Sequence, residues 1–254
     1  MPPLIDTHAH LDEIEDLDRS IAAARTNGVE AIIAVGQELK SNQRALEIAR
    51  EYSGYVYTAL GLHPRLLGNL NEGQLQENID FISAHIGQAI ALGEVGLDYD
   101  KRVLKGSPKL VQQDVLTSLL KIAAAESKPV SLHSRYAWKD CLQLVTEMNV
   151  KKVVFHWYTG LSSTLSQLLQ AGYFVSATPA AEYHDEHRRA IKEAPLGQLM
   201  LETDCPVTYG RENRYRSSPS DVLRSLKAAS SLKYIDEERL AEITTSNAHR
   251  FFGI

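Results

Sequence analysis

The sequence predicts a single-domain (β/α)8 barrel of the TIM type over residues 1–254, with an extra helix at the C-terminus. The first observation behind this class is that short β-rich runs alternate with longer amphipathic segments, which is typical of βα units repeated on a parallel sheet. The second is size, because 254 residues with 44% hydrophobic content suffice for eight such units and one buried core. No linker or shift in composition divides the chain.

The expected elements follow from two periodicities. Short apolar runs that end at a glycine or a polar residue predict strands, at residues 4–10, 31–35, 55–60, 89–92, 129–133, 152–156, 173–176 and 198–202. Apolar residues with helical spacing predict helices, at residues 14–27, 41–51, 75–86, 109–126, 138–148, 162–171, 220–232 and 236–252. Residues 99–108 and 207–219 are expected as longer loops.

Polar side chains follow the expected strands at their C-terminal ends. His8 and His10 lie two residues apart on an extended chain, so both imidazoles point the same way. The other strand ends carry Glu94, His133, His156 and Asp204. In a (β/α)8 barrel these ends form one rim, where the active site lies. The alternative architecture, an open doubly wound sheet, would not gather side chains from so many strands.

These six residues have the chemistry of a metal centre. Four histidines and two carboxylates exceed the needs of one tetrahedral ion with an open position, but they suit two divalent ions that share a carboxylate. Glu94 is the natural shared ligand. Two ions activate a water and stabilise charge on the attacking and leaving oxygens, so hydrolysis is the expected reaction, with Asp204 accepting the proton. The ligands alone do not choose between phosphoryl and carbonyl substrates.

Three further residues near the rim are candidates for the site. His63, just before Pro64, either shapes a turn or contacts substrate. Arg135 follows His133 by two residues, and its guanidinium matches the geometry of a phosphate. Asp98 is either a hydrogen-bond partner of a metal ligand or an ordinary loop acid.

Basic and remaining histidine residues have less specific interpretations. Two basic stretches either hold a phosphate backbone beside aromatic faces or are ordinary solvated loops: Lys101, Arg102 and Lys105, and Arg211, Arg214 and Arg216 around Tyr209 and Tyr215. The histidines in helical segments are expected to have no role in the site: His85, His184, His187 and His249.

Six motifs, spread over the whole chain, resemble those of the TatD family of metal-dependent deoxyribonucleases, within the wider amidohydrolase-type barrels. They are I-D-T-H-A-H-L-D at 5–12, G-L-H-P at 61–64, G-E-V-G-L-D-Y at 93–99, P-V-S-L-H-S-R at 129–135, L-E-T-D-C-P at 201–206 and N-A-H-R-F-F-G at 247–253. The resemblance implies one ion on His8, His10 and Asp204, a second on His133 and His156, and Glu94 shared between them. It also implies a magnesium-dependent exonuclease that acts on DNA from the 3′ end.

The chain departs from the family pattern at three places on the rim. After His156 it has Trp157, Tyr158 and Thr159 where the family usually has Cys-Phe-Ser, so the wall beside that ligand is bulkier. The seventh strand leads into Ala177 rather than the more usual glycine, and Ser218 replaces the asparagine common before the proline past the eighth strand. All three changes concern the substrate rather than the metal.

The composition of the chain argues against several other classes of protein. A net charge of −5 gives no general attraction to a polyanion, so binding of nucleic acid would depend on local groups or bound metal. Two cysteines, Cys141 and Cys205, do not suggest a disulfide framework. Neither a membrane-spanning run nor a signal peptide is apparent, so we expect a cytoplasmic protein with no membrane association and no obligate protein partner.

The expected function is therefore a metal-dependent deoxyribonuclease with DNA as substrate, RNA being the alternative. Magnesium is expected as the ion in use, and manganese and zinc are compatible with the same ligands. A second hypothesis is a carboxyl-ester or amide hydrolase, such as an aminoacyl deacylase, that uses the same metals on a carbonyl. A third is a non-catalytic binding protein with a structural metal site, but none of the expected ligands is missing.

Overall fold

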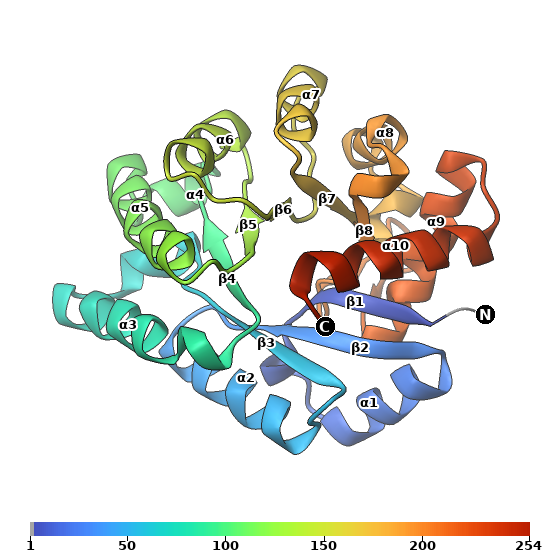
Figure 1. Cartoon of the computed structure of the whole chain (residues 1–254), viewed down its shortest axis with the longest axis horizontal. Helices are drawn as coiled ribbons and strands as arrows, with labels where there is room; N and C mark the ends of the chain where they lie inside the picture. Colours follow the sequence, from blue (N-terminus) through green and yellow to red (C-terminus); the bar gives the residue numbers. More distant parts are fainter. Residues whose placement is uncertain (1–2) are drawn as a thin grey trace.

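Eight parallel strands form a ring in the computed structural model, which describes residues 3–254 (Figure 1). Each strand pairs with the next one along the chain. The strands are β1 (Leu4–Ala9), β2 (Val29–Val35), β3 (Val56–Leu60), β4 (Ala91–Gly96), β5 (Val130–His133), β6 (Val153–Phe155), β7 (Phe174–Ala177) and β8 (Leu199–Leu201). The predicted (β/α)8 barrel is confirmed, although β4 continues past its expected end at residue 92 to Gly96.

Helices surround the ring on its outer side (Figure 1). They are α1 (Leu17–Thr26), α2 (Leu39–Glu51), α3 (Glu72–His85), α4 (Lys101–Leu104), α5 (Lys109–Ala125), α6 (Trp138–Glu147), α7 (Ser162–Gln170), α8 (Asp185–Glu193), α9 (Val222–Lys233) and α10 (Glu237–Phe252). The expected C-terminal helices are confirmed as α9 and α10. Within residues 3–254, no helix combines the length and apolar character needed to cross a membrane.

Two segments expected as loops contain short regular elements. In the segment 99–108, the Asp100 carboxylate accepts a hydrogen bond from the Arg102 amide and begins the single turn of α4. The loop after β8 contains a small antiparallel hairpin of β9 (Thr208–Tyr209) and β10 (Tyr215–Arg216). Neither element has the apolar repeat that predicts a helix or strand from sequence.

The ring closes between β8 and β1 through residues at the C-terminal ends of these strands. The Asp204 amide donates to the His8 carbonyl at 2.8 Å, and the His10 amide donates to the Cys205 carbonyl at 2.8 Å. Beneath these bonds, the buried Asp6 carboxylate accepts from the Thr203 amide and hydroxyl at 2.9 and 2.6 Å. Closure of the barrel therefore depends on the same short segments that carry His8, His10 and Asp204.

The core has an outer and an inner part. Most of the apolar side chains pack between the strands and the surrounding helices. A smaller cluster fills the inside of the ring near the strand starts and includes Ile5, Ala31 and Met200. Helix α10 completes it with Phe251 and Phe252, and the chain ends near the middle of the ring (Figure 1). The bottom of the barrel is thus sealed, which leaves the opposite rim for the site.

Candidate metal centre

The first group of potential ligands surrounds His8 and His10 at the end of β1. Their Nε2 atoms are 3.4 Å apart, so the two rings point to one place, as the sequence predicts. Asp204 Oδ1 lies 3.6 Å from Nε2 of His8 and 3.2 Å from Nε2 of His10. Glu94 Oε2 lies 3.5 Å from each of these nitrogens. Three strand ends that are distant in sequence therefore supply two imidazoles and two carboxylates to one point.

A metal ion fits among these four atoms. Ligands at about 2.0–2.1 Å from a tetrahedral ion lie about 3.3–3.4 Å from one another. The two imidazole nitrogens lie 3.4 Å from each other and 3.2–3.6 Å from the two carboxylate oxygens. Imidazole with carboxylate suits zinc and manganese and also admits magnesium. The geometry and the donor chemistry are both those of a cation site.

A second group surrounds the other oxygen of Glu94. Oε1 lies 2.8 Å from Nδ1 of His133 and 2.9 Å from Nε2 of His156. His63 also faces this oxygen, with its Nε2 at 3.3 Å, while its Nδ1 accepts a hydrogen bond from the Arg65 amide. His63 therefore has the contact expected of a turn residue and also lies beside Glu94, while its contact with substrate stays a prediction. Glu94 presents one oxygen to each group of ligands.

Hydrogen bonds fix the orientation of the imidazoles. Nδ1 of His10 lies 3.0 Å from the Val35 carbonyl and 3.0 Å from Nε2 of the Gln37 side chain, and these contacts turn Nε2 of the ring towards Asp204 and Glu94. Nε2 of His133 contacts Asp98 Oδ2 at 3.1 Å, and this contact turns Nδ1 of the ring towards Glu94 Oε1 at 2.8 Å. Asp98 is thus the carboxylate partner of a potential ligand, an arrangement typical of metal sites.

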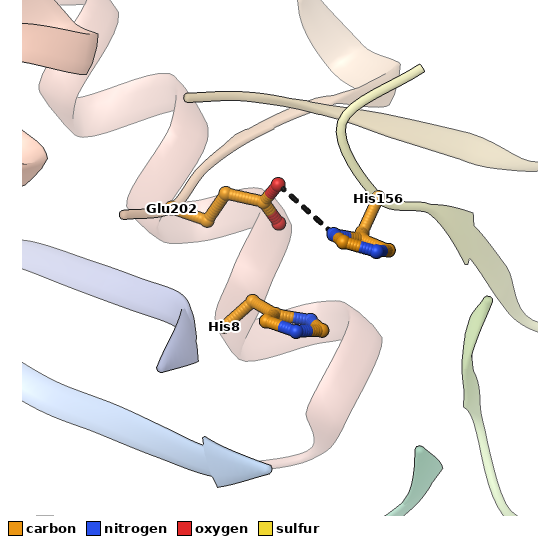
Figure 2. A group of neighbouring side chains, drawn as sticks. All are labelled: His8, His156 and Glu202. Atoms are coloured by element: carbon orange, nitrogen blue, oxygen red, sulfur yellow. Dashed lines mark ion pairs between the residues drawn. The ribbon is translucent and has the colours of Figure 1, made fainter. Parts of the chain in front are cut away.

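Glu202 at the end of β8 also belongs to the site, and sequence reasoning did not identify it. Figure 2 shows its carboxylate beside the nitrogen edge of the His156 ring, and this ring stacks on His8 with centroids 4.2 Å apart. Glu202 Oε1 lies 3.4 Å from Nδ1 of His156 and accepts a hydrogen bond from the Trp157 amide at 3.0 Å. Its position two residues before Asp204 could have identified it, because side chains two residues apart on an extended chain point the same way.

The electrostatics of the site favour a bound cation. Burial would raise the pKa of Glu94, but the surrounding histidines hold it well below its usual range. Burial likewise opposes ionisation of Asp204, whose pKa is nevertheless lowered by His10 and His8. At His10, Asp204 and Glu94 outweigh burial and raise the pKa to about 9. For His63 burial dominates and lowers the pKa to about 4. Two ionised, buried carboxylates therefore lie among imidazoles.

The two groups open into a cavity of about 870 Å³ at the C-terminal ends of the strands. Its wall contains three guanidinium groups and three aromatic side chains: Arg65, Arg135, Arg189, Tyr136, Trp138 and Trp157. Arg135 makes two bonds to Asp98, from Nε at 3.1 Å and from Nη2 at 2.8 Å, which hold it at the cavity edge. His184, expected to be ordinary, lines the cavity as well.

Arg65 and Arg189 were not identified from the sequence. Arg65 directly follows the H-P pair of the third strand, and its Nη2 donates to the Gln37 side chain at 2.9 Å. Arg189 comes from α8 and donates to the Gly160 carbonyl and to the Ser162 hydroxyl. A helix position far from any strand end gave no signal for its place in the wall.

The two basic stretches lie elsewhere. The wall of the cavity, among residues 3–254, includes none of their arginines or lysines. Arg102 pairs with Asp100 on the surface, and Arg216 pairs with Glu15. Tyr209 is fully buried rather than available as an aromatic face.

The fold and this geometry together define a class. A (β/α)8 barrel that gathers two histidine–carboxylate groups around a shared glutamate has the architecture of a metal-dependent hydrolase. The chain belongs to the TatD-related DNase family, whose model matches residues 5–253.

Individual relatives agree with this assignment. The chain is 31% identical over 260 residues to human deoxyribonuclease TATDN3, covering 98% of this chain and 94% of the relative. It is 32% identical over 261 residues to the metal-dependent hydrolase YabD of Bacillus subtilis (strain 168), covering 99% of each. The crystal structure of the TatD homologue YJJV from Escherichia coli K12 aligns with a TM-score of 0.88 at 26% identity, covering 99% of this chain and 98% of that one.

Proposed function

We propose that the protein is a deoxyribonuclease that removes nucleotides from the 3′ end of DNA, with two divalent ions as cofactors. The observation that carries the proposal is the position of Glu94, whose two oxygens face two separate groups of ligands. Guanidinium groups in the adjoining wall match the geometry of phosphate. The name of the human relative, a deoxyribonuclease, supports DNA as the substrate.

The ligands divide between the ions in a defined way. The first ion would be held by His8, His10 and Asp204, the second by His133 and His156, and Glu94 would be shared. When bound, the ions supply Lewis-acid stabilisation of the phosphate oxygens and increase the acidity of a water molecule. Magnesium is the ion that we expect in use, and zinc or manganese fits the same donors.

Residues of the chain supply the remaining steps. Asp204 is ionised because its pKa is lowered by His10 and His8 against burial, so it enters the reaction able to accept the proton of the attacking water. Arg135 is held by Asp98 through only two of its N–H groups, so the others are free to bind a phosphate oxygen. His63, kept neutral by burial, would donate a hydrogen bond to an oxygen of the substrate from Nε2, because its Nδ1 already accepts from the Arg65 amide.

Metal-stripped protein incubated with end-labelled single-stranded DNA tests the proposal. Adding magnesium, manganese or zinc in turn should restore cleavage, and a 5′ label should report progressively shorter products if nucleotides leave from the 3′ end. An RNA of the same sequence measures the preference for DNA. His133→Ala should abolish cleavage, whereas His85→Ala, a change on α3 outside the cavity, should not.

Hydrolysis of an aminoacyl ester by a preparation that cleaves no DNA with any of the ions would contradict the proposal. That outcome would assign the same metal centre to carbonyl chemistry. Cleavage that proceeds equally in a chelator would contradict the role of the ions.

A further inference from the structure

Two aromatic residues of the cavity wall have an uncommon backbone conformation. Tyr136 and Trp157 have φ angles of 58° and 42°, values that bulky L-residues rarely adopt. Three of the other non-glycine residues with positive φ, Ser127, Asn149 and Tyr234, lie one or two residues past the end of a helix, where a left-handed residue terminates the helix. Tyr136 and Trp157 instead follow β5 and β6, so this local explanation does not apply to them.

Trp157 is held in place by a buried tyrosine and by hydrogen bonds to its backbone amide. Its ring packs against Tyr209, with centroids 5.4 Å apart and an interplanar angle of 48°. Tyr209 is fully buried and donates from its hydroxyl to the Thr203 carbonyl at 2.8 Å. The Trp157 amide is fixed by Glu202 at 3.0 Å and by the Ser176 hydroxyl at 3.1 Å. A half-buried indole with such fixed support is preorganised for contact rather than free to move.

Tyr136 has a similar arrangement on the Arg135 side of the cavity. It is 60% exposed, an unusual state for a large side chain that also lines a cavity. Its ring packs edge-on against Trp138 at 5.9 Å, and Trp138 in turn packs near Tyr158 at 6.2 Å. In the sequence, each of these two aromatic residues directly follows a polar residue of the site: Trp157 follows His156, and Tyr136 follows Arg135.

We propose that Trp157 and Tyr136 bind the substrate by stacking on the nucleobases beside the scissile phosphate, with Trp157 as the main platform. The inference rests on the proposed nuclease function. Phosphate-binding guanidinium groups beside aromatic faces are the combination that binds an unpaired nucleotide, and stacking tolerates any base because every base has a π-face. The chain should therefore need a base at the cleaved end but should discriminate little among the four bases.

Binding in a metal-free chelator buffer tests the contact separately from cleavage. The chain has two tryptophans, so in Trp138→Phe the tryptophan emission, excited selectively over that of the tyrosines, comes from Trp157 alone. A short oligothymidine should quench this emission, and an oligomer of the same length with abasic end nucleotides should not. Trp157→Leu should bind the oligothymidine about 5- to 150-fold more weakly, the range expected when one stacking contact is lost.

Matched variants separate stacking from damage to the fold. Trp157→Phe retains an aromatic face and should recover most of the affinity. Tyr136→Ala should weaken binding, whereas Tyr234→Ala should not, because Tyr234 is 91% exposed and lies outside the cavity wall. Equal affinity of the wild type for the base-bearing and abasic oligomers would overturn the inference.

Cleavage with the active ion distinguishes this inference from the proposed function. Trp157→Leu should raise KM for the ordinary oligomer, and removing the terminal bases should add little to that rise. If the wild type cleaves base-bearing and abasic ends equally well, the stacking role is wrong and the nuclease function stands. If the wild type cleaves no DNA with any ion, both are wrong.

Discussion

At the scale of single residues, the position of Glu94 depends on a glycine of the neighbouring strand end. A Cβ atom on Gly61 would lie 2.3 Å from the Glu94 amide nitrogen and from its carbonyl oxygen. No side chain fits at that distance, so any other residue would displace the backbone that carries the shared carboxylate. The G-L-H-P motif therefore contributes space through Gly61 as well as the imidazole of His63.

Asp204 allows metal binding and proton transfer to be separated. Asp204→Asn retains an oxygen near His10 but removes the negative charge and the ability to accept a proton. We expect this variant to keep much of its metal and to lose at least about 100-fold in kcat, the lower end of the contribution of a general base. His8→Ala should instead lower the metal content, because it removes a ligand. Metal analysis beside single-turnover kinetics checks both, and full activity of Asp204→Asn would contradict its role as base.

Most of the candidate site residues that follow strands were identifiable from the sequence, with Glu202 as an exception, whereas Arg189, which comes from a helix, was not. His8, Glu94, His133 and Asp204 were identifiable because strand-end positions converge in a barrel. Arg189 reaches the same cavity from a helix, through the packing of α8 beside the loop after β6. Such convergence depends on tertiary packing, which the periodicity of the sequence does not report.

At the scale of elements, α10 closes the barrel at the end opposite the site. Its buried face places Phe251 inside the ring against Phe174, with ring centroids 5.2 Å apart. The Thr245 hydroxyl of the same helix donates to the Pro3 carbonyl at 2.8 Å and ties the helix to the start of β1. This helix therefore supports the strand that carries His8 and His10 from the opposite end of the barrel.

Phe251→Ala should destabilise the fold by about 3–5 kcal/mol, the usual cost of truncating a buried phenylalanine. The residue is 1% exposed, so the cavity left behind would have no access to solvent. Urea unfolding followed by circular dichroism measures the change. Leu110→Ala on α5, where the side chain is 73% exposed, should stay within about 0.5 kcal/mol of the wild type. An equal effect of the two substitutions would show that α10 does not seal the core.

Most elements with a clear periodicity were predicted within a few residues. Helix α8 (Asp185–Glu193) is an exception, because no helix range was predicted between the seventh and eighth expected strands. The other exceptions have a physical cause. The C-terminal part of β4 contains glycine and an acid, which are poor strand formers, yet it pairs with β5 as far as Gly96 and His133. The tertiary ladder thus overrides local propensity where the site is built. The single turn of α4 depends on one capping carboxylate, and it has no apolar repeat from which a helix could be predicted.

At the scale of the whole molecule, stability should depend on pH through His187, which is fully buried beside β7. Its Nε2 accepts from the Thr178 amide at 3.1 Å, and its Nδ1 donates to the Tyr158 carbonyl at 3.0 Å, so the ring is neutral. Burial lowers its pKa from 6.5 to about 4. Between these values the unfolded chain binds a proton that the folded chain does not, so stability falls as pH decreases from 6.5 towards 4.

The expected loss from this residue is roughly 3 kcal/mol over that range. Other buried groups titrate as well, so the test compares the wild type with His187→Gln in urea at several pH values. The variant should be less stable than the wild type near neutral pH, and the difference should shrink as pH falls towards 4. Parallel pH curves would contradict the assignment.

The closure of the ring between β8 and β1 determines the point during synthesis at which the metal centre can form. Thr7 donates to the Leu201 carbonyl across 194 positions of sequence, and the neighbouring bonds bring His8 and Asp204 together. Contacts of such sequence separation are costly to form and come late in folding. A ribosome-bound chain that has most of the barrel would therefore still lack hydrolase activity. His8 and His10 are made first, but Asp204 joins them only after the eighth strand has been synthesised. The topology delays hydrolysis until almost the entire polypeptide has been made.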